Sequence, residues 1–256
     1  MSVRDYRPES YGEGFADVYD EWYLGHFDNA ATVAYLERVG RATPGAPARL
    51  RVLELAVGTG RLALPLAARD HDVTGVDVSP DMLAVLAGND PGGRVTAICG
   101  DMVDDLPDGP FDLAFVAYTS LFMLTEPDRQ AACFAAVAAR LAPGGAFVVE
   151  AFVPDDPPRD GTDVTLRSMT AGSVVLSVTT ADAASQRVDG QLVELTDGQP
   201  VRLRPYSLRY STPAELDAFA AAAGFALEAR LDDFDGTPFD PDASPRHVSV
   251  FRTMVR

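Results

Sequence analysis

The chain has 256 residues, a formal net charge of -17 at pH 7 and 21 basic residues, all of them arginine. Nucleic acids and anionic membrane surfaces require clustered positive charge, so this composition argues against both as partners. The lack of lysine excludes Schiff-base chemistry and a P-loop lysine. No apolar run reaches the roughly 18 residues of a membrane span, and the first residues lack an apolar signal segment. We therefore expect a soluble, cytoplasmic protein.

An aromatic segment, residues 11–23, precedes the first predicted strand. Its Tyr19, Trp22 and Tyr23 recur at helical spacing, which predicts a short helix. These rings either pack on the core or lie beside a ligand, and the spacing alone favours neither. His26 follows closely and is the most plausible general base among the three histidines of the chain.

Buried strands and alanine-rich helices alternate through the first two-thirds of the chain. The predicted strands are short, β-branched or continuously apolar, as in strands covered on both faces. They are Val52–Ala56, Asp72–Asp77, Val95–Cys99, Leu113–Ala117 and Ala146–Ala151, and the helices between them are Leu62–Arg69, Pro80–Ala87 and Arg129–Leu141. This alternation predicts an α/β fold with a Rossmann-like, mostly parallel sheet flanked by helices.

The pattern changes after residue 152. Short alternating strands, with hairpin signals at Asp189-Gly190 and Asp197-Gly198, predict an antiparallel β cap over residues 153–210. Helical sequence resumes at Ser211–Ala223, and two last strands follow at Ala226–Leu231 and His247–Arg252. We expect three parts: residues 1–152 as the N-terminal helices and cofactor-binding core, 153–210 as the inserted cap over the substrate site, and 211–256 as the completion of the core sheet.

A glycine turn with carboxylates around it is the main functional signal. Gly58 and Gly60 follow the first strand, and Asp77 ends the second, where it can accept from two ribose hydroxyls. This pattern also matches the dinucleotide fingerprint, so an NAD-dependent oxidoreductase is an alternative. Glu54, below the turn, would repel a pyrophosphate but suits the cationic amino-acid part of S-adenosylmethionine. Asp101, after the third strand, is placed to accept from an adenine amine.

The ordered motifs ELAVGTG, GVDVSPDML, GDM, FDLAFVAYTSL, LAPGG and FVVEAF resemble those of the class I S-adenosylmethionine-dependent methyltransferases over about residues 50–152. The resemblance implies a seven-stranded sheet with one antiparallel strand at its edge, here His247–Arg252. It also implies S-adenosyl-L-methionine as the cofactor, held by residues that correspond by position. These are Gly58 and Gly60 at the methionyl portion, Asp77 at the ribose, Met82, Asp101 and Met102 at the adenine, and Tyr118 closing the site, with Ala56 and Val78 as further cofactor-binding residues.

The segment GFADVYDEWY is similar to the opening of a methyltransferase subgroup that N-methylates amino sugars on nucleotide carriers. That similarity implies that Tyr23 lies by the methyl donor, where an aromatic ring or phenol oxygen suits a sulfonium. The subgroup has a histidine in the loop after the fourth strand, and Met123 occupies that position here. Tyr23 and His26 are therefore the catalytic candidates. Tyr19, Phe122 and Arg209 are candidate substrate contacts, as are Arg204, Tyr206 and Tyr210 of the cap.

Motifs of other methyltransferase classes are missing: Ala-Tyr-Thr-Ser follows the fourth strand in place of Asn/Asp-Pro-Pro-Tyr or Pro-Cys. We therefore expect methyl transfer to nitrogen or oxygen of a small-molecule acceptor in specialised metabolism, by a protein that could be a homodimer. A protein that binds S-adenosylmethionine without transferring its methyl group is a second alternative.

The remaining histidines and the cysteines give no sign of a metal site. Cys99 and Cys133 lie in apolar surroundings without CxxC or Cys/His spacing, so we expect two buried, reduced thiols. His71 precedes the second strand, away from its carboxyl end, and should be a surface residue. His247 begins the last strand and should be structural.

Overall fold

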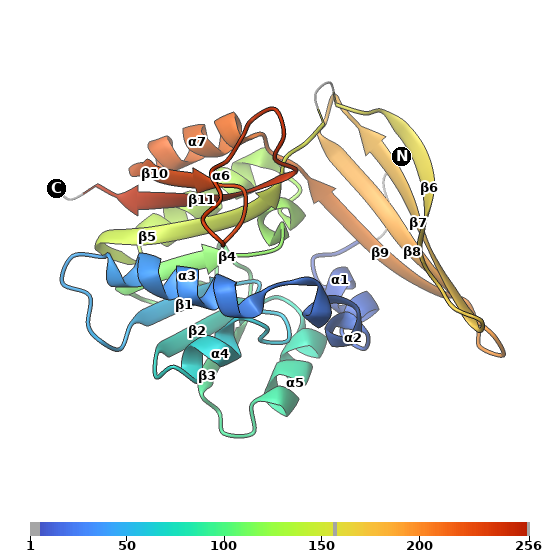
Figure 1. Cartoon of the computed structure of the whole chain (residues 1–256), viewed down its shortest axis with the longest axis horizontal. Helices are drawn as coiled ribbons and strands as arrows, with labels where there is room; N and C mark the ends of the chain where they lie inside the picture. The colour runs from blue at the N-terminus through green and yellow to red at the C-terminus, as the bar shows by residue number, and fades with distance from the viewer. Residues whose placement is uncertain (1–5, 156–157, 255–256) are drawn as a thin grey trace.

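A computed structural model describes residues 6–155 and 158–254 of the chain. Figure 1 shows a twisted sheet flanked by helices, and a second sheet that stands apart at one end of it. The two N-terminal helices, α1 (Ser10–Phe15) and α2 (Tyr19–Tyr23), lie between these two bodies and are followed by the short η1 (Leu24–His26). Among the described residues, no helix is long and apolar enough to cross a membrane.

The larger sheet has seven strands in the order β10-β11-β5-β4-β1-β2-β3. The pairings among β1, β2, β3, β4 and β5 are all parallel. Their bounds are β1 Arg51–Leu55, β2 Asp72–Asp77, β3 Val95–Cys99, β4 Phe111–Val116 and β5 Leu141–Phe152. The expected α/β class with a mostly parallel sheet is confirmed.

The position of the antiparallel strand differs from the expectation. The predicted strand His247–Arg252 corresponds to β11 (Arg246–Thr253), which is antiparallel to its neighbours but lies between β5 and β10 (Phe225–Leu231). The burial of the two strands explains the order. The middle of β11 is continuously buried, as a strand with neighbours on both sides requires, whereas three consecutive residues of β10 are exposed and suit an edge.

Helices cover both faces of this sheet. One apolar cluster joins the sheet to α3 (Asn29–Arg41), α4 (Ala63–Ala67) and α5 (Pro80–Asn89), and the other joins it to η2 (Ser120–Met123), α6 (Pro127–Ala138) and α7 (Pro213–Ala222). Alternation within β1 assigns Val52 to the first cluster and Leu53 to the second. The helix starts follow their caps: the Ser79 hydroxyl accepts from the N–H of Met82, and Thr212 forms a capping box with Glu215.

The smaller sheet is the inserted antiparallel cap, with strands in chain order and hairpin connections. They are β6 (Gly161–Met169), β7 (Ser173–Asp182), β8 (Arg187–Thr196) and β9 (Arg202–Arg209). Asp197-Gly198 lies at a hairpin turn, as predicted, but Asp189-Gly190 lies inside β8. Gly190 is needed for packing, because a Cβ there would come within 2.2 Å of the Tyr206 ring.

Two expectations about single residues are wrong. Cys99 is exposed, because β3 is the edge strand of the sheet and three of its five residues face solvent. His71 is buried: its Nδ1 accepts from the N–H of Leu50 at 3.2 Å and its Nε2 lies 3.3 Å from Glu37. Cys133 is buried as expected, and burial raises the pKa of its thiol to about 12.

Candidate active site

A cavity of about 460 Å³ lies where the carboxyl ends of the parallel strands meet the N-terminal helices and the cap. Its walls come from all three parts of the fold. The loops after β1, β2 and β3 form one half, with Gly58, Asp77 and Asp101, which we call the cofactor half. The N-terminal helices, the loop after β4 and the inner face of the cap form the other, which we call the acceptor half. Ligands of open α/β sheets bind at this edge.

The glycine turn is fastened to the end of the second strand. Asp77 accepts from the N–H of Gly58 at 2.8 Å through Oδ2 and from the N–H of Ser79 at 2.9 Å through Oδ1. Gly58 has a φ of 55°, and a Cβ built on it meets no atom within 4 Å. The turn therefore presents open backbone to the cavity. Burial raises the pKa of Asp77, against these two hydrogen bonds.

Glu54 lies beneath the turn as a buried acid. Its side chain belongs to β1, two residues before Ala56, which lines the cavity. Burial raises the pKa of Glu54 to about 8, while the charge of Arg61 and the Ala63 N–H lower it. Its Oε2 has no hydrogen-bond partner among the described residues. A buried carboxyl oxygen without a partner is costly, so it indicates that a positively charged or donating group belongs there.

The rest of the cofactor half is apolar with one carboxylate. Met82 and Met102 line it, and Met82 is almost fully buried. Asp101 also lines it, and its Oδ1 accepts from the N–H of Val103 and from the guanidinium of Arg129, both at 2.7 Å. These bonds fix the carboxylate at the cavity wall.

Strained backbone is concentrated at the same edge of the sheet. Ala56, Tyr118 and Thr119 all have positive φ, between 51° and 66°, and all three line the cavity. Glu150, a buried acid of β5 that the sequence did not single out, holds the second turn. Its Oε2 accepts from the N–H of Tyr118 at 2.9 Å and its carbonyl accepts from the N–H of Thr119 at 3.0 Å. Such strain persists where the surroundings fix it, commonly at functional sites.

The acceptor half is lined by tyrosines. Tyr19 and Tyr23 lie with ring centroids 4.8 Å apart, and Tyr118 lies 5.4 Å from Tyr23. The Tyr11 phenol hydrogen-bonds to that of Tyr23, and Tyr206 enters from the cap. Burial raises the pKa of Tyr11, Tyr19 and Tyr206, and that of Tyr118 to about 12. These four phenols are therefore neutral at physiological pH.

Arg167 is the one cationic side chain that lines the cavity in the described part of the chain. It is the extra residue of a β-bulge in β6, because Leu166 and Ser168 pair with the adjacent residues Leu176 and Val175. Bulges commonly redirect a side chain. The guanidinium carbon lies 4.9 Å from the ring centroid of Tyr23, within cation–π range.

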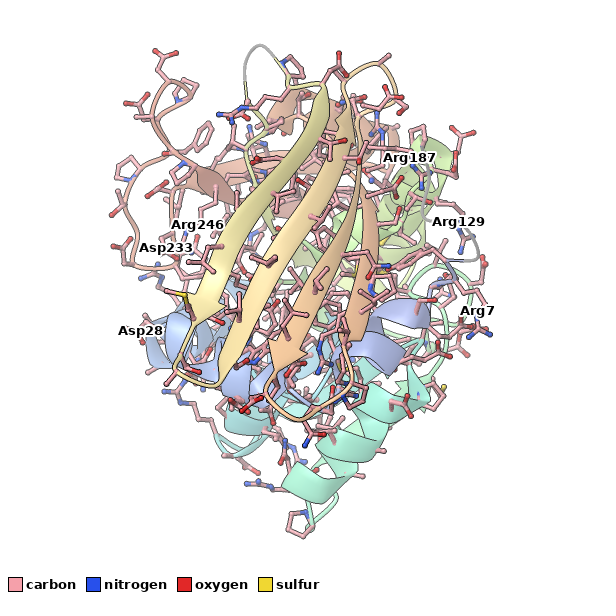
Figure 2. All side chains as sticks on the ribbon, turned by 90° about the vertical axis from the view of Figure 1, so that its right-hand side faces the viewer. Arg7, Asp28, Arg129, Arg187, Asp233 and Arg246 are labelled. Atoms are coloured by element: carbon pink, nitrogen blue, oxygen red, sulfur yellow. The ribbon has the colours of Figure 1, made fainter. Side chains whose placement is uncertain are left out.

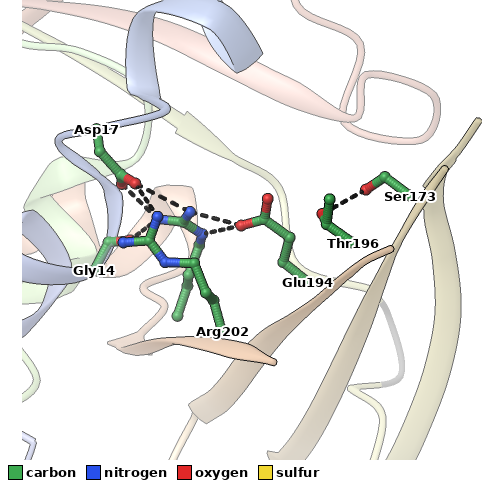
Figure 3. A network of polar contacts seen from close by, with 7 residues as sticks. Gly14, Asp17, Ser173, Glu194, Thr196 and Arg202 are labelled. Atoms are coloured by element: carbon green, nitrogen blue, oxygen red, sulfur yellow. Dashed lines mark hydrogen bonds and ion pairs between the residues drawn. The ribbon is translucent and has the colours of Figure 1, made fainter. Parts of the chain in front are cut away.

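A buried arginine fastens the cap to the N-terminal helices. Arg204 of β9 is 1% exposed and donates to Glu194 of β8 and to Asp17, each at 2.6 Å, as well as to the carbonyl of Gly14. Figure 3 shows this network, with the exposed Arg202 bonded to the same Asp17. The network therefore joins two walls of the acceptor half directly, the cap and the N-terminal helices.

Most of the predicted site residues line this one cavity. They are Tyr19, Tyr23, Ala56, Gly58, Asp77, Val78, Met82, Asp101, Met102, Tyr118 and Tyr206. The side chain of His26 lies outside the described part of the structure, although its backbone ends η1.

Several predicted residues lie away from the cavity wall. Glu54 lies beneath it. Gly60 packs against the core, where a Cβ would approach Leu86 to 2.2 Å, and Phe122 is fully buried against Phe152. Arg209 is buried at the base of the cap, where it pairs with Glu215 at 2.7 Å. Among the described residues, Arg204 and Tyr210 also do not line the cavity.

Other lining residues were not singled out from sequence. Tyr11 and Phe15 are one helical turn apart and stack at 4.3 Å, a spacing that could have identified them. Arg167 and Ser177 carried no such signal, because sequence does not show which face of a cap strand points inward.

The strand order, the glycine turn fastened by Asp77 and the cavity at this edge define a Rossmann-like enzyme that takes a nucleoside cofactor. The family described as "Methyltransferase domain" matches residues 52–145. The chain is 36% identical to the CcbJ methyltransferase from Streptomyces caelestis, with 97% of this chain and 100% of that one covered and a TM-score of 0.87. The chain belongs to the class I S-adenosylmethionine-dependent methyltransferases, and its cofactor is S-adenosyl-L-methionine.

Two further relatives are more distant. The cypemycin N-terminal methyltransferase of a Streptomyces species is 28% identical over 193 residues, which cover 73% of this chain and 77% of that protein. CalS10 of Micromonospora echinaspora, an amino pentose methyltransferase of calicheamicin biosynthesis with S-adenosylmethionine bound, is 26% identical. It covers 93% of this chain and 97% of its own, with a TM-score of 0.70. Because the chain belongs to this family, the alternative function that the glycine turn allowed, an NAD-dependent oxidoreductase, is excluded.

Proposed function

We propose that this methyltransferase acts on an amine nitrogen of a small-molecule acceptor in antibiotic or related specialised metabolism. The observation that carries the proposal is the acceptor half of the cavity, lined by neutral phenols and directly joined to the cofactor half. The names of two relatives support it, since one methylates a peptide N-terminus and the other an amino pentose.

The cofactor half fits S-adenosylmethionine in charge and shape. Glu54 has a buried oxygen without a partner, which suits a cationic group, and the open backbone at Gly58 leaves room for close approach. We assign Asp77 to the ribose hydroxyls and Asp101 with Met82 to the adenine. When bound, the cofactor supplies a methyl group activated by its sulfonium.

The acceptor half favours nitrogen over oxygen. A site that raises the pKa of its phenols through burial also disfavours an ammonium, so it lowers the pKa of a bound amine and favours the nucleophilic neutral form. A hydroxyl acceptor would need a base. No described side chain of the acceptor half is a histidine or a carboxylate. His26 is our candidate for the group that takes the proton left on the amine nitrogen after methyl transfer.

The N-terminal helices and the cap would position the acceptor and exclude water. We assign Tyr23 and Tyr19 to the acceptor's reacting end, since their rings lie together in the acceptor half and Tyr19 is within electrostatic range of Glu54, beneath the cofactor half. Arg167 would contact the acceptor from the cap, beside Tyr23. Methyl transfer depends on holding the nucleophile about 3 Å from the reacting carbon, and the Arg204 network keeps both walls of this half in place.

Incubation with a deuteromethyl-labelled cofactor and paired acceptors tests the proposal. Each pair consists of an amine and its hydroxyl counterpart, drawn from amino sugars, amino acids and peptide N-termini, and products are identified by mass spectrometry. We expect label on amines, and none with an Asp77→Ala variant. Label on the hydroxyl members alone would contradict the assignment to nitrogen. Tight cofactor binding without any labelled product, including in cell extract, would support a protein that binds S-adenosylmethionine without transfer.

A further inference from the structure

Charge is divided between the two halves of the cavity. Asp77 and Asp101, the two acids that line it in the described chain, both belong to the cofactor half, whereas Arg167 belongs to the acceptor half. A negative group on the acceptor is therefore repelled at one end of the cavity and attracted at the other. Such an acceptor would bind in one orientation, with its negative group toward the cap.

Arg167 also differs from the other arginines of the cap sheet. The sheet holds five arginines, and four of them pair with a carboxylate of the protein: Arg187, Arg202, Arg204 and Arg209. Figure 2 shows the cap from outside, with Arg187 near one end of the sheet, where it lies 3.6 Å from Glu126. Arg167 has no ion pair or hydrogen bond with any described residue, although acids outnumber arginines in this chain by 38 to 21. Its negative partner is therefore missing from the described protein.

Two rings of α2 hold the guanidinium of Arg167. Its carbon lies 4.9 Å from the ring centroid of Tyr23 and 5.5 Å from that of Trp22. An arginine that lies over aromatic rings keeps its N–H donors for hydrogen bonds in the plane of the guanidinium. These donors form a fork that matches the two oxygens of a carboxylate. The rings thus place an anion-binding group in the cavity without neutralising it.

The positive charge of Arg167 acts on the middle of the acceptor half. It lowers the pKa of Tyr118 and of Tyr206, against the burial that raises both. Tyr23, which we assign to the reacting end of the acceptor, lies directly against the guanidinium. An amine at Tyr23 and an anion at Arg167 are therefore close together, which requires that few bonds separate them in the acceptor.

We propose that the acceptor is an amino acid, held with its free carboxylate on Arg167 and its amine beside Tyr23. The proposal depends on the proposed transfer to an amine nitrogen and names the class of acceptor. A carboxylate fits better than a phosphate, because a single guanidinium matches a single negative charge and the chain has no lysine to add a second.

The ion pair also assists the chemistry. A free carboxylate next to an amine stabilises the ammonium form, and pairing with Arg167 cancels this effect, so it favours the neutral nucleophile. The nitrogen lone pair then forms the bond to the methyl carbon, and the bond from that carbon to sulfur breaks with its electrons on sulfur. The methylated nitrogen afterwards loses one proton.

Steady-state kinetics with matched acceptors tests the proposal. Each amino acid of a panel is compared with its own carboxamide and with the corresponding aminophosphonic acid, using the deuteromethyl-labelled cofactor. We expect kcat/KM for the preferred amino acid to exceed that for its carboxamide by about tenfold or more, as for a hydrogen-bonded ion pair. The carboxamide tests the charge, since it keeps the size and the amine of the acid.

Arg167→Gln should remove this preference. It should lower kcat/KM for the amino acid about tenfold and change that for the carboxamide by less than about twofold. Arg167→Lys keeps the charge but not the fork, and it should restore part of the preference. The matched control is Arg159→Gln, because Arg159 precedes β6, has an 80% exposed side chain and does not line the cavity. This variant should keep the full preference.

Fluorescence of Trp22 gives a readout that does not need turnover. Trp22 is the only tryptophan of the chain, and its ring lies against Arg167. In the presence of the demethylated cofactor, amino acids should change its emission with saturation, and their carboxamides should need about tenfold higher concentrations. The comparison uses the natural chain alone, so it holds even where a variant fails to fold.

The outcomes separate this proposal from the proposed function. Equal kcat/KM for amino acids and carboxamides, or label on amino sugars and not on amino acids, would overturn the proposal and keep transfer to amines. A preference that Arg167→Gln leaves intact, or a stronger preference for the aminophosphonic acids, would overturn it as well. Label on no amine would contradict the proposed function itself. In that case the fluorescence titration decides, and saturation by no amino acid of the panel would overturn the carboxylate site.

Discussion

The backbone N–H of Gly58 donates a 2.8 Å hydrogen bond to the carboxylate of Asp77, and this bond ties the glycine turn after β1 to the end of β2. The other oxygen of the same carboxylate accepts from Ser79, whose hydroxyl caps α5. One acid therefore sets the positions of the turn, the strand end and the helix start. The residue assigned to the cofactor ribose also builds the cofactor half.

Asp77→Asn should weaken cofactor binding at least tenfold. An asparagine has one acceptor oxygen and one NH2 group, so one of the two N–H donors at Gly58 and Ser79 would face another donor. The lost hydrogen bond to a charged group corresponds to about 1.4 kcal/mol or more. Isothermal titration calorimetry with S-adenosylmethionine measures the change. Asp81→Asn is the control, since Asp81 is exposed in the first turn of α5. Equal affinity for both variants would contradict the prediction.

Arg204→Met should destabilise the fold by about 3 kcal/mol, because it leaves Asp17 and Glu194 without the buried partner that they share. Arg202→Met is the control. Arg202 lies on the same strand and pairs with the same Asp17, but its side chain is 55% exposed, so the cost should stay near 0.5 kcal/mol. Urea unfolding at neutral pH measures both. Similar costs for the two variants would show that burial of the pair is not what matters.

The pH dependence of this difference has a definite sign. Burial raises the pKa of Asp17, but hydrogen bonds and charge from Arg204 and Arg202 outweigh it and hold that pKa below its usual 3.8. An acid with a lowered pKa contributes its stability above the unfolded value and loses it as pH falls through the folded one. The difference in the free energy of unfolding between the natural chain and Arg204→Met should therefore shrink below about pH 4.

Glu54 should make the cofactor-free protein less stable as pH rises. Its pKa is raised from 4.5 to about 8, so its contribution is complete below 4.5 and is lost between there and pH 8. Glu54→Gln removes this dependence. The melting temperature of Glu54→Gln minus that of the natural chain should therefore be larger at alkaline pH than at mildly acidic pH. Thermal unfolding across that range measures the effect, and parallel curves would contradict it.

Binding of the cationic cofactor should release a proton from Glu54 near neutral pH, because a positive ligand favours the ionised carboxylate. Calorimetry in two buffers with different ionisation enthalpies measures the proton count. We expect release from the natural chain and none from Glu54→Gln. Glu150→Gln is the control, since Glu150 is also a buried acid with a raised pKa but is already held by Tyr118. Release that persists without Glu54 would place the proton elsewhere.

The cofactor half could be predicted from sequence because its signals are local. An apolar strand, two glycines and an acid at the next strand end fix Gly58 and Asp77 within one βαβ unit. The two glycines nevertheless differ in role. Gly60 allows close packing against Leu86, and this contact is visible only in the three-dimensional structure.

The acceptor half depends on contacts between distant segments. Tyr11 reaches the cavity from α1, Ser177 from β7 and Tyr206 from β9. In the loop after β4, the turn of η2 buries Phe122 and brings its neighbour Met123 to the cavity wall, where the sequence favoured Phe122. A one-residue difference of this kind depends on backbone geometry, which periodicity does not specify.

Arg167→Gln should raise the KM for the acceptor about tenfold and leave the cofactor Kd unchanged. The bulge in β6 aims this guanidinium at the cavity beside Tyr23, so its donors would meet the acceptor and not the cofactor half, which is built from the loops after β1, β2 and β3. A lost hydrogen bond from a charged group corresponds to a change of about this size. Steady-state kinetics with an acceptor identified by deuteromethyl labelling gives KM, and calorimetry gives the cofactor Kd. Arg69→Gln, an exposed arginine after α4, is the control and should change neither. A raised cofactor Kd with an unchanged KM would reverse the assignment and place Arg167 in the cofactor half.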